Sequence, residues 1–386
     1  MSQIYLDYNA STPIAPEVAD AMRPFLMGHY GNPSSAHWAG APAKQAVENA
    51  RRQVAGLLGC AAEEVVFTSG GTEANNHAIK GVFFSPSRKG NHIITTQVEH
   101  PALLQPCRFL ERLGAEVTYL PVDGAGRVSP EHVRQSIRPG TILVSVMHAN
   151  NEVGTIQPIV EIARITREHG VLLHTDAAQS AGKIPTQVAD LGVDLLSVAG
   201  HKLYAPKGVG ALYVRQGLHI EPLMHGAGHE AGRRAGTENV LLDVALGAAC
   251  ELAKANLEAR RTHLTELRDY FHTGMTRLFG DALRLNGHVS KRLPNTLNVT
   301  FPGHIGSEVL AALEGVAAST GSACHSGRHE LSPVLKAMGV SEPAGLGAVR
   351  FSLGFGTTID ELDRVLAMLE SQILRRPKSR QTHRHS

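Results

Sequence analysis

The sequence Leu195-Leu196-Ser197-Val198-Ala199-Gly200-His201-Lys202 joins a short apolar run to a lysine directly behind it. The apolar run predicts a buried strand that ends at Gly200, where the pattern breaks. A lysine at such a strand end is either a solvated loop residue or a desolvated amine, because burial disfavours the charged form. A neutral amine can attack a carbonyl group and form a Schiff base. Lys202 is therefore a candidate nucleophile, and this stretch alone leaves both interpretations open.

Similar apolar segments recur from residue 65 to residue 214 and alternate with helical segments. The predicted strands span residues 65–68, 92–96, 117–120, 142–146, 171–174, 195–198 and 211–214. Short apolar strands that alternate with helices predict an α/β domain whose mostly parallel sheet is covered on both faces. In such a sheet the ligand lies outside the carboxyl ends of the strands. We therefore expect the functional residues at those strand ends.

The pattern changes after about Thr237. A long helix is predicted over residues 240–279, followed by a smaller α+β unit with strands at 296–299, 316–320 and 349–352 and helices at 307–313 and 359–374. We expect a large domain over residues 15–255 and a small domain built from 1–14 and 256–376. The small domain carries a loop near 320–332 that is expected to be mobile. Residues 377–386 are polar and basic, which predicts a disordered tail.

Composition excludes several classes of protein. The formal net charge of the 386 residues is +2, so no strong field favours nucleic acid or a membrane surface. No apolar run is long enough to cross a bilayer, and the N-terminal residues do not resemble a signal peptide. Cys60, Cys107, Cys250 and Cys324 are far apart, which is typical of reduced thiols in a cytoplasm rather than of disulfides or a zinc site.

Polar residues follow several of the predicted strands. Ser69-Gly70-Gly71-Thr72-Glu73-Ala74-Asn75 lies between a strand and a helix, where free N–H groups and a hydroxyl suit a phosphate, although an ordinary tight turn with a threonine cap explains it too. His100 ends another strand and either stacks on a flat cofactor or is a core histidine. Asp176 follows a third, and a buried aspartate needs a partner such as a protonated pyridine nitrogen, unless it is a surface residue or a helix cap.

Taken together, the motifs resemble a cysteine desulfurase, a pyridoxal-phosphate enzyme of the class V aminotransferase group. The resemblance runs from about Tyr5 to Leu374 and comprises eight motifs in order. They are Ser69-Gly70-Gly71-Thr72-Glu73, Glu99-His100, Asn150-Asn151-Glu152, Asp176-Ala177-Ala178-Gln179, Gly200-His201-Lys202, Arg234-Ala235-Gly236-Thr237, Ser319-Thr320-Gly321-Ser322-Ala323-Cys324 and Arg350-Phe351-Ser352-Leu353-Gly354. It implies the fold-type I architecture of these enzymes, with a mostly parallel central sheet and a second, smaller α+β domain.

The resemblance also implies roles around the cofactor pyridoxal 5'-phosphate. Lys202 forms the Schiff base, Asp176 pairs with the pyridine nitrogen, and His100 stacks on the ring and is a candidate for moving protons. Asn151 and Gln179 hydrogen-bond around the ring and its phenolic oxygen. The residues expected to hold the phosphate are Gly71, Thr72 and His201, with Thr237 contributed by the neighbouring subunit of a homodimer.

A substrate-binding residue and one departure from the family pattern follow from the same resemblance. Arg350 is expected to bind the substrate carboxylate as a fork, next to Asn151. The family usually has a serine or threonine before Gly-His-Lys, where this chain has Ala199, so one phosphate hydrogen bond is missing or supplied by another group. Lys183 and Lys207 are rival Schiff-base lysines, but neither falls at the motif position.

Cys324 separates a desulfurase from a transaminase. Its segment, 320–329, has two glycines and no helical pattern, and Arg328, His325 and His329 nearby favour the nucleophilic thiolate. The alternative for a lone cysteine is a small buried hydrophobe, which fits Cys60, Cys107 and Cys250 better. The segment resembles the longer-loop branch of the family, whose cysteine passes sulfur to a partner protein.

The expected activity is removal of sulfur from L-cysteine, with L-alanine as product and a persulfide on Cys324 that an acceptor protein then receives. The alternatives are transamination or selenocysteine lysis on the same cofactor, a scaffold protein without catalysis, and a metal-binding module built on the 21 histidines. Gly226 and Gly228 argue against a rigid helix between His225 and His229, and no metal is expected. The sequence does not name the sulfur acceptor.

Overall fold

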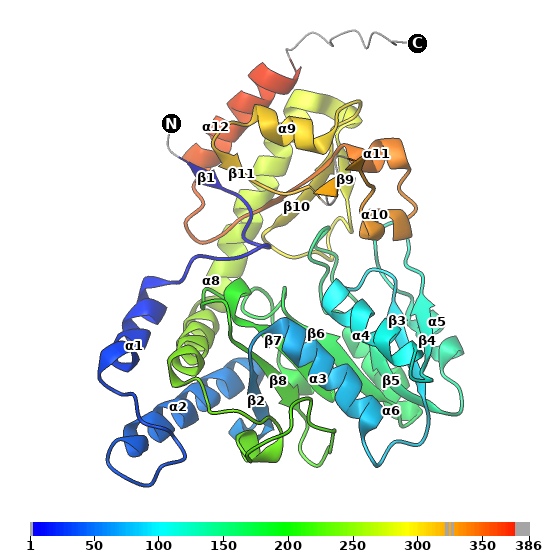
Figure 1. The fold of residues 1–386 in the computed structure, drawn as a ribbon. Coiled ribbons are helices and arrows are strands. Elements are labelled where there is room, and N and C mark those ends of the chain that lie inside the picture. The colour runs from blue at the N-terminus through cyan, green and yellow to red at the C-terminus, as the bar shows by residue number, and fades with distance from the viewer. Residues whose placement is uncertain (1–2, 321–323, 326–327, 375–386) are drawn as a thin grey trace.

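The computed structural model describes residues 3–320, 324–325 and 328–374, with the backbone alone at 324–325 and 328–329. A seven-stranded sheet forms its larger part (Figure 1). Its strands, in spatial order, are β2 (Val65–Thr68), β8 (Gly210–Val214), β7 (Leu195–Ala199), β6 (Leu172–Asp176), β5 (Thr141–Ser145), β3 (His92–Thr96) and β4 (Glu116–Leu120). Only β8 runs against its neighbours, so the carboxyl ends of the other strands meet at one edge of the sheet.

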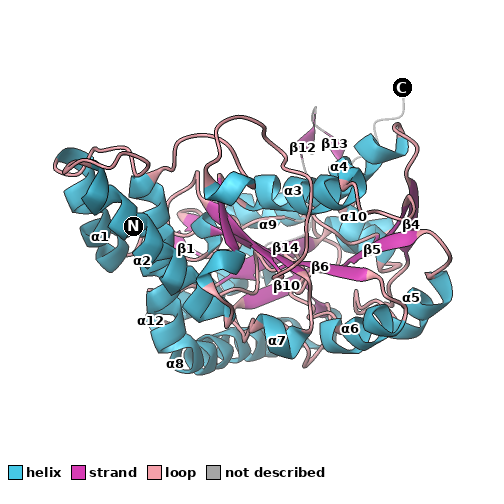
Figure 2. Ribbon diagram, turned by 90° about the horizontal axis from the view of Figure 1, so that it is seen from below, coloured by secondary structure: helices cyan, strands magenta, loops and turns pink. Residues whose placement is uncertain are grey.

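Helices cover both faces of this sheet because its strands are apolar on both sides. On one face α3 (Gly71–Phe84) and α4 (Pro101–Glu111) pack on side chains such as Ile93 and Leu212. On the other face lie α2 (Gly40–Leu58), α6 (Ile159–Glu168), α7 (Val188–Leu191) and the first half of α8 (Val240–Phe279), as Figure 2 shows. The predicted two-sided α/β architecture is confirmed.

A second apolar core lies beyond the middle of α8. Its members come from the second half of that helix, from the antiparallel sheet β14-β10-β9 and from α9 (Gly306–Ala312) and α12 (Ile359–Leu369). The three strands are β9 (Arg284–Asn286), β10 (Thr296–Thr300) and β14 (Ala348–Ser352). The N-terminal strand β1 (Ile4–Tyr5) pairs with β11 (Val316–Ala317), so the start of the chain packs in this part. The domain boundaries at 14/15 and 255/256 stay a prediction.

Hydrogen bonds from capping side chains mark where α8 and α12 begin. The side chain of Asn239 caps α8 by accepting from the N–H of Leu242. Thr358 and Glu361 form a capping box at the start of α12, and a single π-helical turn over Glu370–Leu374 follows that helix. The predicted helix over 359–374 is therefore regular only to Leu369.

Several short elements lack a sequence pattern and were not predicted. They are α5 (Pro130–Ser136), α7, α10 (Pro333–Ala337), α11 (Glu342–Leu346), β9, and the pair β12 (Cys324–His325) and β13 (Arg328–His329). All of these except α5 have only two to five residues, too short for a periodicity to appear. The expected tail at 377–386 lies outside the described residues, as do 321–323 and 326–327 of the predicted loop. Among the described helices, none has the length and apolarity needed to cross a membrane.

Candidate active site

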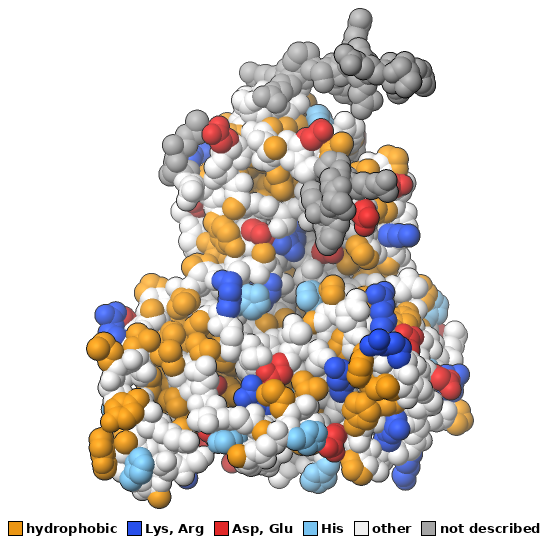
Figure 3. Space-filling model, viewed as in Figure 1, with side chains coloured by type: hydrophobic (Ala, Val, Ile, Leu, Met, Phe, Trp, Pro, Cys, Tyr) orange, Lys and Arg blue, Asp and Glu red, His pale blue; other side chains and the backbone are white. Residues whose placement is uncertain are grey.

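A cavity of about 580 Å³ lies at the carboxyl edge of the large sheet. The strands β2, β3, β5, β6 and β7 each deliver polar residues to it, and Arg350 of β14 and Asn9 of the N-terminal segment close its far side. The space-filling view shows basic and histidine side chains gathered along the boundary between the two parts of the molecule (Figure 3). Nine residues predicted for the site line the cavity: Gly71, Thr72, His100, Asn151, Asp176, Gln179, His201, Lys202 and Arg350.

Lys202 follows β7 in a single 3₁₀ turn, and its amine is held by backbone oxygens. Its Nζ donates to the carbonyl oxygens of Asn9, at 2.5 Å, and Ala10, at 2.7 Å. Burial lowers the pKa of Lys202 to about 8, and the charge of Arg350 acts in the same direction. Asp7 and Asp176 oppose the shift of this pKa. The neutral amine that a nucleophile requires is therefore far more populated near neutral pH than in an ordinary lysine.

Asp176 ends β6 and presents a buried carboxylate to the cavity. Its Oδ2 accepts from Asn75 Nδ2 at 2.7 Å, and its Oδ1 accepts from the N–H of Ala178 at 2.9 Å. These partners are neutral, and Asn75 Oδ1 is itself buried without a partner in the described structure. Asn75 stands in the quoted motif, but its role was missed, because only the packing of α3 against the sheet brings it to Asp176.

The start of α3 forms another wall of the cavity. Gly70 has φ +147°, a conformation that a side chain would strain, and no side chain caps the helix. The N–H groups of its first turn are therefore available to an anion in the cavity. A Cβ atom on Gly71 would lie 3.2 Å from the Cβ atom of Ala199. Ala199 thus faces the helix start, where the expected hydroxyl is absent.

Two histidines line the same cavity. His100 Nδ1 accepts from the N–H of Ala102 at 3.1 Å, so this ring caps α4 and is fixed in place. Burial lowers the pKa of His100, as does the charge of Lys202, whereas Asp176 opposes the change. Burial, together with Lys202 and Lys207, lowers the pKa of His201 to about 4. Both rings are therefore mainly neutral at pH 7.

Arg350 brings a guanidinium group from the second sheet. Its Nη1 donates to the carbonyl oxygen of Asn151 at 3.0 Å, and its Nη2 pairs with Asp7 Oδ1 at 2.7 Å. Its Nε is buried without a partner in the described structure, and each Nη has a second N–H that can donate to a carboxylate in the cavity. Asp7 was assigned no role from the sequence, because it is 343 residues away in the chain.

Other predicted residues lie elsewhere. Thr237 does not line this cavity but a neighbouring one of about 250 Å³. Of the two rival lysines, Lys207 lines the cavity and Lys183 is buried behind Gln179. The backbone of Cys324 pairs with that of His329, and its side chain lies outside the described structure.

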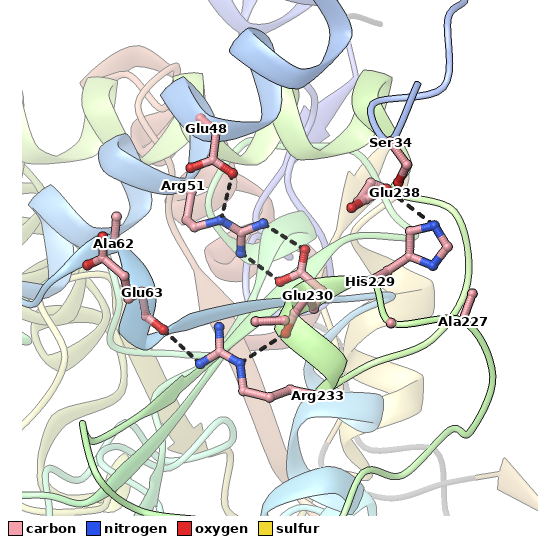
Figure 4. A pocket seen from close by; sticks show the side chains of 12 residues that line it. Ser34, Glu48, Arg51, Ala62, Glu63, Ala227, His229, Glu230, Arg233 and Glu238 are labelled. Carbon is pink, nitrogen blue, oxygen red and sulfur yellow. Dashed lines mark hydrogen bonds and ion pairs between the residues drawn. The ribbon is translucent and has the colours of Figure 1, made fainter. Parts of the chain in front are cut away.

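A larger cavity, of about 740 Å³, is lined by charged groups that neutralise one another (Figure 4). Arg51 forms a fork on Glu230, with Nη1 at 2.6 Å and Nη2 at 2.7 Å from its carboxylate oxygens. Arg233 donates to the backbone oxygens of Glu63 and Glu230. His229 also lines this cavity, and among the described residues no group of three His, Cys, Asp or Glu side chains is arranged for a metal ion. The amine and carboxylate suited to cofactor chemistry are at the other cavity.

Comparison with known proteins gives a consistent result. The family model described as aminotransferase class-V matches residues 4–365. The cysteine desulfurase IscS of Dictyoglomus turgidum is 50% identical over 370 residues, which cover 95% of this chain and 94% of that protein. The IscS of Methanosarcina thermophila is 48% identical, with 95% and 91% covered. The chain belongs to the cysteine desulfurases, within the class V aminotransferase family.

Solved structures of similar proteins share the fold of this cysteine desulfurase. A NifS-like protein superposes with a TM-score of 0.89 at 39% identity, over 95% of this chain and 98% of the other. A structure described as SspA in complex with cysteine gives a TM-score of 0.81 at 39% identity, over 91% and 98%. These neighbours confirm the predicted fold-type I architecture and the family assignment that the motifs indicated.

Proposed function

We propose that this cysteine desulfurase uses pyridoxal 5'-phosphate to take sulfur from L-cysteine, leaving L-alanine and a persulfide on Cys324. The observation that carries the proposal is the placement of the Lys202 amine, the Asp176 carboxylate and the Arg350 fork around one cavity. These are the amine, the carboxylate and the guanidinium group that a pyridine cofactor and an amino-acid substrate require. The relative described as bound to cysteine supports the choice of substrate.

The donor set fits this cofactor. The uncapped start of α3 and His201 suit its phosphate, and the carboxylate of Asp176 suits its ring nitrogen. The unpartnered Oδ1 of Asn75 leaves one polar atom beside Asp176 to be satisfied. His100 has the fixed, neutral ring that stacking requires. When bound, pyridoxal phosphate supplies an aldehyde that condenses with amines and a ring that accepts electrons from the substrate α-carbon.

Each of the site residues has a distinct role in the proposed reaction. Arg350 binds the substrate carboxylate and fixes which bond of the α-carbon faces Lys202. Lys202 is the amine that would hold the cofactor covalently, and its Nζ, once released, takes the α-proton. Cys324 Sγ attacks the substrate sulfur, so that an S–S bond forms as the C–S bond breaks. The electron pair stays with the substrate carbon, which is protonated on the way to alanine, with His100 and Lys202 as candidate donors.

Two further parts of the proposal concern other proteins. Thr237 lies outside the cavity of its own chain, as expected if it completes the site of a second copy in a homodimer. A persulfide on Cys324 is a carrier of sulfur, so an acceptor protein is required to remove it. Co-purification with this enzyme would identify that acceptor.

The test is the Cys324→Ser variant, with Cys60→Ser as the matched control, since Cys60 is a free thiol outside the site. The Cys324 variant should keep its cofactor and still change its spectrum with L-cysteine, because Lys202 and Asp176 are unaltered. It should not sustain alanine formation, because a hydroxyl is a poor nucleophile toward sulfur. In the unaltered enzyme, mass spectrometry should find one extra sulfur on the Cys324 peptide and none on those of Cys60, Cys107 or Cys250.

Normal alanine formation by Cys324→Ser would refute the persulfide mechanism. Alanine formed without a keto-acid co-substrate would separate desulfuration from transamination. The Cys60→Ser control should match the unaltered enzyme in both products.

A further inference from the structure

Lys183 is a buried lysine whose only described hydrogen-bond partners are uncharged amide oxygens. Its Nζ donates to Gln179 Oε1 at 2.9 Å and to Asn9 Oδ1 at 3.1 Å. The residue is 8% exposed. Burial lowers the pKa of Lys183 to about 7, with Lys202 and Arg350 acting in the same direction. A lysine buried at such a cost in a site already rich in cations requires a reason.

The partners of Lys183 connect it to the reacting amine. A lysine amine donates to Gln179 Oε1, so the amide of Gln179 must direct its Nε2 the other way, and Nε2 donates to the carbonyl oxygen of Asn9 at 2.9 Å. That same oxygen accepts from Lys202 Nζ. Lys183 therefore holds Asn9 twice, directly at its side chain and through Gln179 at its backbone.

The carbonyl of Asn9 controls where the lone pair of Lys202 points. A neutral amine has two N–H bonds and one lone pair, and here Lys202 Nζ donates to the carbonyl oxygens of Asn9 and Ala10. When both N–H bonds are used in this way, only one direction is left to the lone pair. A shift of the Asn9 oxygen would turn the amine and change that direction. Nucleophilic attack depends on such an orientation.

We propose that Lys183 is a positioning residue for Lys202, acting through Gln179 and Asn9. Lys183 orients the Gln179 amide, and this amide fixes the Asn9 carbonyl oxygen. The Asn9 oxygen in turn orients the Lys202 amine toward the cavity. The inference rests on the proposed function, because it takes Lys202 as the amine that reacts with the cofactor.

The experiment is a double-mutant cycle with Lys183→Met and Gln179→Ala. Methionine has a similar length and flexibility but cannot donate. The first readout is the rate at which cofactor-free protein takes up pyridoxal phosphate, followed by its visible absorption, and the second is kcat/KM for L-cysteine. Each single variant should slow uptake by about 10- to 100-fold, because misplaced reacting groups cost that much. The double variant should lose no more than about a further two- to threefold.

A structural role alone would give a different result. In that case the losses of uptake would follow losses of thermal stability, whereas a positioning role slows uptake in variants that remain as stable as the unaltered protein. Lys254→Met, at an exposed position on α8, is the control for loss of a lysine and should match the unaltered protein. Uptake by Lys183→Met equal to that of the unaltered protein, or multiplicative effects in the cycle, would overturn the inference.

Two further variants separate a folding defect from a positioning role, and the positioning role from the proposed function. If Lys183→Met does not fold, the cycle is run with Lys183→Leu, which is shorter and likewise cannot donate, and the same lack of additivity is expected. Lys202→Ala, measured in parallel, tests the proposed function separately. Covalent retention of the cofactor by Lys202→Ala would refute the assignment of Lys202, whatever Lys183→Met shows.

Discussion

Replacing Arg350 by lysine should raise the KM for L-cysteine by roughly 10- to 150-fold. Two of the arginine's groups are used within the protein, on Asn151 and Asp7, and the buried Nε is unpartnered. A substrate carboxylate can take two N–H bonds from this fork, whereas a lysine offers one direction at most. A hydrogen bond to a charged group contributes about 1.5–3 kcal/mol, and about 1.4 kcal/mol corresponds to a factor of ten.

The assay compares L-cysteine with cysteamine, which has the thiol and the amine but no carboxylate. Arg350→Lys should weaken L-cysteine binding, measured by the spectral change on mixing, and leave cysteamine binding nearly unchanged. The control is Arg268→Lys, because Arg268 is equally buried, with 10% of its side chain exposed, but pairs with Asp269 and the Leu293 carbonyl. Equal losses for L-cysteine and cysteamine in Arg350→Lys would refute a carboxylate-binding role.

Two other predictions follow from the cavity. Uptake of pyridoxal phosphate by cofactor-free protein should speed up as pH rises through about 8, because the lowered pKa of Lys202 makes the reactive neutral amine dominant above it. Well below that pH the rate should fall by about tenfold per unit, and a rate that still rose tenfold per unit beyond pH 9 would show an ordinary lysine pKa and contradict the lowered pKa of Lys202. Ala199→Ser should tighten cofactor binding by roughly 10-fold or more, because Ala199 faces the start of α3 and a hydroxyl there can donate to a phosphate. Equilibrium dialysis would measure it, and affinity equal to that of the unaltered protein would mean that another group already fills the place.

Much of the site could be predicted because it depends on local pattern. Strands such as 195–198 and 142–146 are readable as short apolar runs, and the structure places them in one sheet. Parallel strands bring their carboxyl ends to the same edge, so His100, Asp176 and Lys202 had to lie near one another. The motif resemblance added Arg350, which comes from the other part of the chain.

The strand ends do not explain how these groups are held. Asn9 and Asp7 lie in the N-terminal segment, which the sequence assigned only to the small domain, yet they hold Lys202 and Arg350. These contacts join residues 193 and 343 positions apart. No local periodicity encodes a contact of that kind, because it depends on how two separate cores pack.

Lys202 and Lys183 show where sequence and tertiary structure divide. By sequence alone both are candidate Schiff-base lysines, and only Lys202 falls at the motif position. The structure turns Lys202 into the cavity and buries Lys183 against the amides of Gln179 and Asn9. The sequence by itself determined which polar residues follow each strand of the sheet. Tertiary packing decided which amine faces the cavity and how each charge is desolvated, because burial and electrostatic neighbours are properties of the folded chain.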